Sequence, residues 1–192
     1  MFWEGKIFWG GQNVHVPQNL LRLQKHHRNR NQLIGVNPMK YWLMKSEPYA
    51  YSIDDLEKEG VTMWDGIRNY EARNFMRDQM QLGDRALFYH SNVKPPCIVG
   101  EMEVCSKPYP DPYQFDPDSK YFDAKSSENN PRWMLVDLKY VQTFQQPVDR
   151  DVLQKDPILA EMMLFKRNRL SITPVTPEQY KRVLELASNH RG

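Results

Sequence analysis

The chain has too few cysteines for a disulfide framework, because Cys97 and Cys105 are the only two among its 192 residues. They lie eight positions apart in one strand-like segment, so we predict two buried free thiols and a reducing compartment. Long apolar runs are also lacking, since no stretch approaches the roughly 18 residues of a membrane helix. The first residues mix charge and glycine with apolar side chains, unlike a secretory signal. We therefore expect no membrane partner.

Several motifs of metal and phosphate chemistry are missing as well. Neither HExxH nor CxxC spacing occurs, and the chain has no glycine-rich phosphate loop. The adjacent His26 and His27 lack a second His or Cys pair at ligand spacing. The nucleophile elbow Gly-x-Ser-x-Gly is absent too. The sequence therefore predicts no bound metal and no cofactor, and it contains no complete set of catalytic residues.

Charge is unevenly distributed along the chain. Residues 1–38 hold five basic residues against the single acidic Glu4, a net charge of +4, so the rest of the chain carries −2 of the overall +2. A near-neutral body is unlike a protein that holds a long DNA duplex by counterion release. We predict a poorly ordered basic extension over 1–38, one domain over 39–187 and a tail over 188–192. Met39 opens the patterned part and is a candidate natural start.

The apolar periodicity after residue 39 changes several times. Buried or alternating apolar runs predict strands at 40–45, 85–90, 97–105, 133–144 and 170–172. Helical spacing and capping residues predict helices from Ser52, over 69–80 with Asn69 as N-cap, and over 148–153, 158–165 and 177–187. Gly100 predicts a bulge or bend, and the Pro- and Asp-rich residues 107–131 predict a long exposed loop. Together these elements predict an α+β fold, a small mixed or antiparallel β-barrel with peripheral helices.

Polar side chains gather directly after the predicted strands and turns, at residues 45–47, 64–69, 89–92 and 167–171. The second cluster begins with Trp64 in a turn beside Asp-Gly, where pattern alone favours a core anchor. The alternative is a wall for a flat ligand, because a nucleobase stacks on an aromatic face and needs donors and acceptors along its edge. The candidate edge groups are Ser46, Asp65, Asn69, Ser91 and the backbone near Gly66. Arg68 and Arg73 are candidates for phosphate contacts or for surface ion pairs.

Several short motifs occur in one order along the chain. They are Lys45-Ser46-Glu47-Pro48, the run from Trp64 to Asn69, Ala72-Arg73-Asn74-Phe75, the run from Phe88 to Asn92, Asn130-Pro131-x-Trp133, and Arg169-Leu170-Ser171-Ile172. With these motifs the chain resembles the EVE domain over about residues 39–187. The match is specific because the motifs are collinear, whereas any one of them alone would be weak.

The resemblance implies a PUA-like pseudobarrel, related to the YTH readers of methylated adenine in RNA. It implies a non-enzymatic reader of a single modified base, such as methylated or hydroxymethylated cytosine, in DNA or RNA. The base would leave its stack and lie against aromatic walls. Trp64 is the first candidate wall and Trp133 the second, whereas Trp42 is predicted to be core. Such a protein is expected in the nucleus of a eukaryote or in the cytoplasm of a bacterium.

By this resemblance, the predicted ligand-binding residues are Lys45, Ser46, Glu47, Trp64, Asp65, Gly66, Arg68, Asn69, His90, Ser91, Trp133, Arg169 and Ser171. Two other functions stay open. One is an enzyme acting on modified nucleosides or nucleotides through Ser46, Glu47 or His90, with His90 being either a base or a hydrogen-bonded structural group. The other is a scaffold whose 107–131 loop binds a partner.

Overall fold

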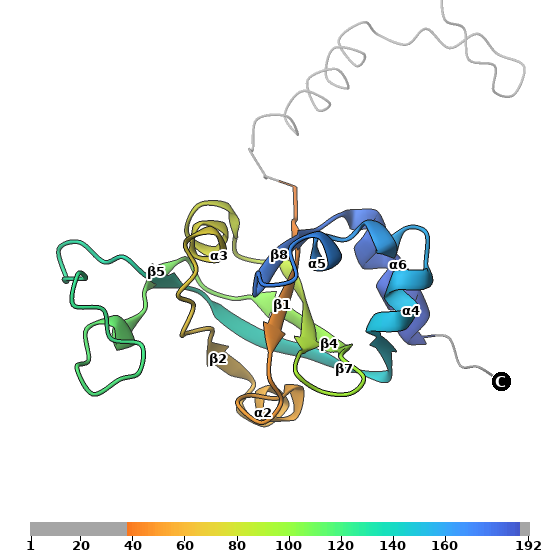
Figure 1. Ribbon diagram of the computed structural model, residues 1–192, viewed down its shortest axis with the longest axis horizontal. Coiled ribbons are helices and arrows are strands. Elements are labelled where there is room, and N and C mark those ends of the chain that lie inside the picture. The colour runs from red at the N-terminus through yellow and green to blue at the C-terminus, as the bar shows by residue number, and fades with distance from the viewer. Residues whose placement is uncertain (1–37, 189–192) are drawn as a thin grey trace, which may run out of the picture. The chain divides into compact units, whose positions relative to one another are not determined.

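The computed structural model describes residues 38–188. Apart from Pro38, the predicted basic extension lies outside these residues, as does the tail beyond Ser188. The described chain is built on a six-stranded mixed sheet with helices around it, so the predicted α+β class is confirmed (Figure 1). In spatial order the strands are β2 (Val61–Met63), β7 (Asp137–Asp149), β4 (Cys97–Val104), β3 (Arg85–His90), β1 (Tyr41–Ser46) and β8 (Ile172–Val175).

The first strand pairs with two distant parts of the chain. β1 runs parallel to β3, with Ser46 opposite His90, and antiparallel to β8, with Met44 opposite Ile172. The other pairings within the sheet are antiparallel. The register of β4 shifts between Ile98 and Gly100, which confirms the predicted bulge. The parallel pair brings the carboxyl ends of β1 and β3 together at one edge of the sheet.

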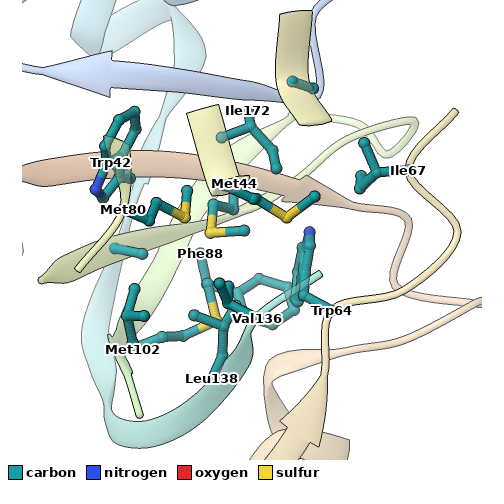
Figure 2. Packing of buried hydrophobic residues seen from close by; sticks show 14 of the residues in the cluster. Trp42, Met44, Trp64, Ile67, Met80, Phe88, Met102, Val136, Leu138 and Ile172 are labelled. Carbon is teal, nitrogen blue, oxygen red and sulfur yellow. The ribbon is translucent and has the colours of Figure 1, made fainter. Parts of the chain in front are cut away.

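Successive side chains along a strand point to opposite faces of the sheet. Each face carries its own cluster of buried apolar residues. In β1, Trp42 and Met44 belong to one apolar cluster and Leu43 to another. Figure 2 shows the first cluster, in which Met44 and Trp64 pack near Phe88. Trp42 is 1% exposed, so its predicted core position is confirmed. Its indole N–H donates to the Asp84 carboxylate over 2.9 Å.

Helices cover the two faces separately. The first apolar cluster includes residues of α2 (Ile53–Glu59), α3 (Tyr70–Asn74) and the π-helical turn η1 (Phe75–Gln79). The second includes residues of α4 (Arg150–Lys155), the 3-10 turn η3 (Leu159–Glu161), α5 (Met163–Lys166) and α6 (Pro177–Ser188). In Figure 1, α4 and α6 lie toward one end of the sheet, and α5 lies beside β8. None of the helices in residues 38–188 has the length and apolarity that a membrane crossing requires.

Two of the predicted helix starts are marked by the capping side chains that the sequence indicated. Ser52 caps α2 in a reciprocal pair with Asp55, and the Asn69 side chain accepts from the backbone N–H groups of Glu71 and Ala72. The segment predicted as a helix over 69–80 is helical through Gln79, but its second half is the π-helical turn η1 and not an α-helix. Two other boundaries move: β7 continues to Asp149 through the predicted helix start, and the last strand begins at Ile172.

The long exposed loop predicted over 107–131 is only partly correct. The β4–β6 connection (residues 105–133) contains β5 (Tyr109–Pro110), which pairs with β6 (Met134–Leu135), and the 3-10 turn η2 (Pro112–Gln114). It has buried polar residues of its own. Gln114 is fully buried, and its amide donates to the carbonyls of Asp111 and Trp133 over 2.8 Å each. Internal hydrogen bonds therefore give this segment a fixed conformation.

The two cysteines are free, as predicted, but each is only half-buried. Burial raises the pKa of both thiols, and the carboxylates of Asp149 and Asp137 add to the effect at Cys97 and Cys105 respectively. A raised thiol pKa lowers the thiolate fraction at neutral pH and with it the reactivity.

Candidate nucleic-acid interface

The functional residues gather where β1 and β3 end. The Ser46 carbonyl accepts from the Ser91 backbone N–H over 2.8 Å and from its hydroxyl over 3.2 Å. Consecutive side chains of β1 then diverge. The Ser46 hydroxyl donates to the Tyr51 carbonyl over 2.7 Å, and the Lys45 ammonium donates to the Asn168 carbonyl over 2.8 Å. Two cavities open on these two sides, and both are lined by Lys45 and Ser46.

The first, which we call the Trp64 cavity, has a volume of about 450 Å³. Besides Lys45 and Ser46, its lining includes Tyr51, Trp64, Asp65, Gly66, Lys120 and Tyr121. The size lies within the range of small-molecule sites, which are about 300–1,000 Å³. Three aromatic residues and one carboxylate thus face the same space. This is the combination that binding a planar heterocycle with polar edges requires.

Trp64 combines the two roles that its turn position left open. Its side chain is 6% exposed, belongs to the first apolar cluster and meets Phe88 edge-on, with ring centroids 5.5 Å apart (Figure 2). A small part of it still lines the cavity. Most of the indole is therefore a core anchor. The greater exposed aromatic surface in the lining comes from Tyr51 and Tyr121, which are half-buried.

Asp65 is the carboxylate of the Trp64 cavity, and its environment disfavours ionisation. Burial raises its pKa above the ordinary value of 3.8, and the charge of Asp111 raises it further. Arg68 and Lys120 act in the opposite direction but more weakly. A ligand that donates a hydrogen bond to the Asp65 carboxylate would stabilise its ionised form.

Because the folded state binds the Asp65 proton more tightly than the unfolded state, ionisation of Asp65 costs stability as the pH rises above 3.8. Asp65→Asn is therefore expected to raise the free energy of unfolding relative to the wild type at pH 7, with the gain disappearing near pH 3. Urea unfolding of both proteins between pH 3 and 7 measures the difference. The exposed Asp118→Asn is the matched control. A constant difference across this range would contradict the assignment.

The Trp64 cavity is closed on one side by Tyr121, which the β4–β6 connection carries. The Arg68 guanidinium donates to the Tyr121 carbonyl through Nε, over 3.0 Å, and through Nη2, over 2.6 Å. It also donates to the Asp111 carboxylate over 2.7 Å. The Gly66 N–H donates to the same carboxylate over 3.2 Å, so this backbone group is not the free donor that the sequence suggested. Arg68 thus holds the wall rather than lining the cavity.

The second cavity, which we call the Arg169 cavity, has a volume of about 390 Å³. Its charged lining residues are Lys45, Glu47, Arg150 and Arg169. Ser91 and Ser171 also line it, so the predicted polar clusters after β1, after β3 and before β8 do converge. The β1–β3 and β1–β8 pairings explain this convergence, because they bring the three chain segments to one edge.

Three of the predicted ligand-binding residues, His90, Trp133 and Asn69, form contacts within the fold and do not line either of the two cavities. The His90 Nε2 accepts from the Ile53 N–H over 3.2 Å, and burial lowers the His90 pKa. Trp133 is 5% exposed, stacks on Tyr70 at 4.9 Å and donates to Asp123 over 2.8 Å. Asn69 caps α3 and lines a smaller cavity of about 250 Å³ beside Arg169.

Sequence reasoning missed the cavity residues that carry no local signal. Tyr121 and Lys120 lie in the segment predicted as an exposed loop, and Arg150 lies inside the helix predicted over 148–153, outside the four polar clusters. Arg73 was a candidate phosphate contact, but its guanidinium donates to the Arg132 carbonyl over 2.5 Å. The aromatic content of residues 107–131 is the one feature that would have suggested a wall there.

The mixed sheet is curled and flanked by a few helices. This is the PUA-like fold, which its structural neighbours share. A family model for the EVE domain matches residues 40–186. The chain belongs to the EVE domain family, as the resemblance implied.

The relatives include both named and structurally characterised proteins. Human thymocyte nuclear protein 1 is 40% identical over 169 residues, which cover 78% of this chain and 75% of the relative. The crystal structure of human THYN1 protein in complex with DNA containing 5-methylcytosine has a TM-score of 0.74 at 39% identity, covering 79% of this chain and 99% of that one. A hypothetical protein from Leishmania major has a TM-score of 0.75 at 42% identity, with coverage of 78% and 94%.

Proposed function

We propose that this protein is a non-enzymatic reader of 5-methylcytosine in DNA, and that it binds the base in the Trp64 cavity. The observation that carries the proposal is the shared lining of this cavity, where Asp65 lies with Trp64, Tyr51 and Tyr121. The relative crystallised with DNA containing 5-methylcytosine supports the choice of ligand.

The polar edge of cytosine suits the Asp65 carboxylate. Acidic side chains accept a hydrogen bond from the N4 amino group of cytosine. This bond would replace the water that burial has removed from Asp65, which is half-buried in the cavity wall. The ring and its 5-methyl group are apolar and would lie against the aromatic side chains. A base within a duplex cannot reach such a cavity, so the reader would take it out of the stack.

Tyr121→Leu is expected to weaken binding to a single-stranded oligonucleotide with one 5-methylcytosine by about tenfold, since stacking is worth about 1–3 kcal/mol per base. The main-chain anchors to Arg68 involve the Tyr121 carbonyl and would remain. Fluorescence anisotropy with methylated and unmodified oligonucleotides, single- and double-stranded, measures the effect. Tyr113→Leu, on the same β4–β6 connection but outside the cavity lining, is the matched control.

The two variants separate the possible results. Unchanged affinity of Tyr121→Leu would mean that this ring is not a wall of the site. Equal affinity of the wild type for methylated and unmodified strands would sink the reader proposal itself. RNA oligonucleotides with 5-methylcytosine form a second arm, and tighter binding to them than to DNA would move the proposal from DNA to RNA.

The hydrogen bonds favour binding over catalysis at the alternative residues. A general base needs a free lone pair within reach of the proton that it removes. The His90 Nε2 lone pair is occupied by the Ile53 N–H, and the Ser46 hydroxyl donates to the Tyr51 carbonyl rather than to His90 or Glu47. These partners support a non-enzymatic site. The name of the relatives supports a nuclear location if the chain is eukaryotic.

A further inference from the structure

The Arg169 cavity has a surplus of positive charge that the base contacts proposed above do not use. Lys45, Arg150 and Arg169 line it together with a single acidic residue, Glu47. The Glu47 carboxylate accepts hydrogen bonds from the Tyr49 hydroxyl and the Asn92 side chain. Glu47 therefore already has two hydrogen-bond partners, and the three cations of the lining outnumber it.

The three cations are also left without acidic partners. Within residues 38–188, none of them forms an ion pair, although the neighbouring Arg167 pairs with Glu71. The Lys45 ammonium donates to a carbonyl, and the Arg150 guanidinium lies 5.2 Å from the centre of the Phe165 ring. These contacts orient the side chains and leave their charges uncompensated.

The cost of this arrangement is visible at Lys45. Burial lowers the pKa of its ammonium group, and the nearby charge of Arg150 lowers it further. An anion in the cavity would reverse both effects, because it replaces lost hydration and offsets the repulsion between the cations. Arginine side chains bind phosphate through paired N–H donors, which a carbonyl or an aromatic ring does not fully use.

We propose that the Arg169 cavity binds a phosphodiester group of the strand whose base occupies the Trp64 cavity. This assignment rests on the proposed function. The two cavities adjoin at Lys45 and Ser46, which are consecutive in β1 and line both. The Lys45 ammonium donates to Asn168 of the Arg169 cavity, and the Ser46 hydroxyl donates to Tyr51 of the Trp64 cavity. A base and its flanking phosphate are likewise joined through one sugar. The pair of sites would thus hold one nucleotide unit, with the phosphate fixing its orientation and the base supplying selectivity.

The test uses the full chain and single-stranded DNA with one 5-methylcytosine. Arg169→Gln is expected to weaken binding about tenfold, the size of one hydrogen bond to a charged group. The slope of log affinity against log salt is expected to fall by about 0.7, as for one lost phosphate contact on a single strand. Arg167→Gln is the matched control, since Arg167 precedes Asn168 and Arg169 but lies outside the lining.

Neutral methylphosphonate linkages identify the phosphate. Placed immediately 5′ or 3′ of the modified base, one of them should weaken wild-type binding at least as much as Arg169→Gln does, and should have a smaller effect on that variant, in which Lys45 and Arg150 remain. Additive losses in the variant, or an equal loss in Arg167→Gln, would overturn the assignment.

Two further readouts separate the sources of the anion and the two proposals. If inorganic phosphate at constant ionic strength displaced the strand while both methylphosphonates bound like the natural linkage, the cavity would hold a free anion and the assignment would fail. The ratio of affinities for methylated and unmodified strands depends on the base cavity. A preserved ratio with no coupling between Arg169 and the linkage would therefore reject the phosphate site and leave the base site intact.

Discussion

Replacing Arg68 with methionine is expected to lower the free energy of unfolding by about 3 kcal/mol, because it strands a buried carboxylate. The Asp111 side chain is 1% exposed, and Arg68 is the cation that pairs with it. The same change removes the guanidinium bonds to the Tyr121 carbonyl. Urea unfolding followed by circular dichroism measures the loss.

Two comparison variants give this result its meaning. Arg77→Met removes the arginine of an exposed pair with Asp78 and should cost less than about 1 kcal/mol. Adding Asp111→Asn to Arg68→Met should recover part of the stability, since the buried charge is then gone while an amide oxygen can still accept from the backbone. If Arg68→Met lowered the free energy of unfolding no more than Arg77→Met does, the Arg68–Asp111 ion pair would not be what anchors the β4–β6 connection.

From the proposed function, Gly66→Ala is expected to reduce binding of 5-methylcytosine DNA by more than tenfold, because the added methyl group would displace Tyr121. A Cβ atom built at Gly66 lies 2.5 Å from the Tyr121 ring, and Gly66 has a φ of +71°, which L side chains rarely adopt. The ring must therefore move, and the aromatic wall moves with it. Titration of the methylated oligonucleotide by fluorescence anisotropy measures the loss.

Gly83→Ala separates backbone strain from the steric effect. Gly83 has a similar φ of +89°, but a Cβ atom there meets nothing within 4 Å. Each variant should lose about 1 kcal/mol of stability from the unfavourable backbone conformation. Only Gly66→Ala should lose affinity. Comparable affinities in the two variants would mean that the position of Tyr121 does not matter for the ligand.

The sequence predicted the features that depend on near neighbours. The capping pair of Ser52 with Asp55 depends on four consecutive residues only. The alternation of apolar residues in β1 predicted that Trp42 is buried in the core, as it is. The missed features depend on distant contacts. β2 is a three-residue strand whose apolar content is unremarkable, and it forms because β7 offers a partner. A short strand of this kind has no signal of its own.

The candidate site divides in the same way. Ser46, Ser91 and Ser171 follow strands, and the family motifs drew attention to them before the sheet brought them to one edge. Arg68 and Trp133 belong to the same motifs, but their contacts are with Asp111 and Tyr70 in the supporting structure. Motif membership alone does not distinguish a residue that contacts ligand from one that fixes a wall. That distinction needs the partner, which lies far away in the sequence.

The pairing of β1 with β8 also determines at what point of its synthesis the chain can form the Arg169 cavity. The Lys45 ammonium contacts the carbonyl of Asn168, and the Lys45 backbone N–H donates to the carbonyl of Ser171. Contacts between residues so far apart in sequence close large loops and are formed late in folding. A chain still on the ribosome therefore lacks the Arg169 cavity until residues 168–171 and β8 have emerged, because Asn168, Arg169 and Ser171 line it. A polypeptide released before this point would carry the residues of β1 and β3 but not the cavity that they help to line.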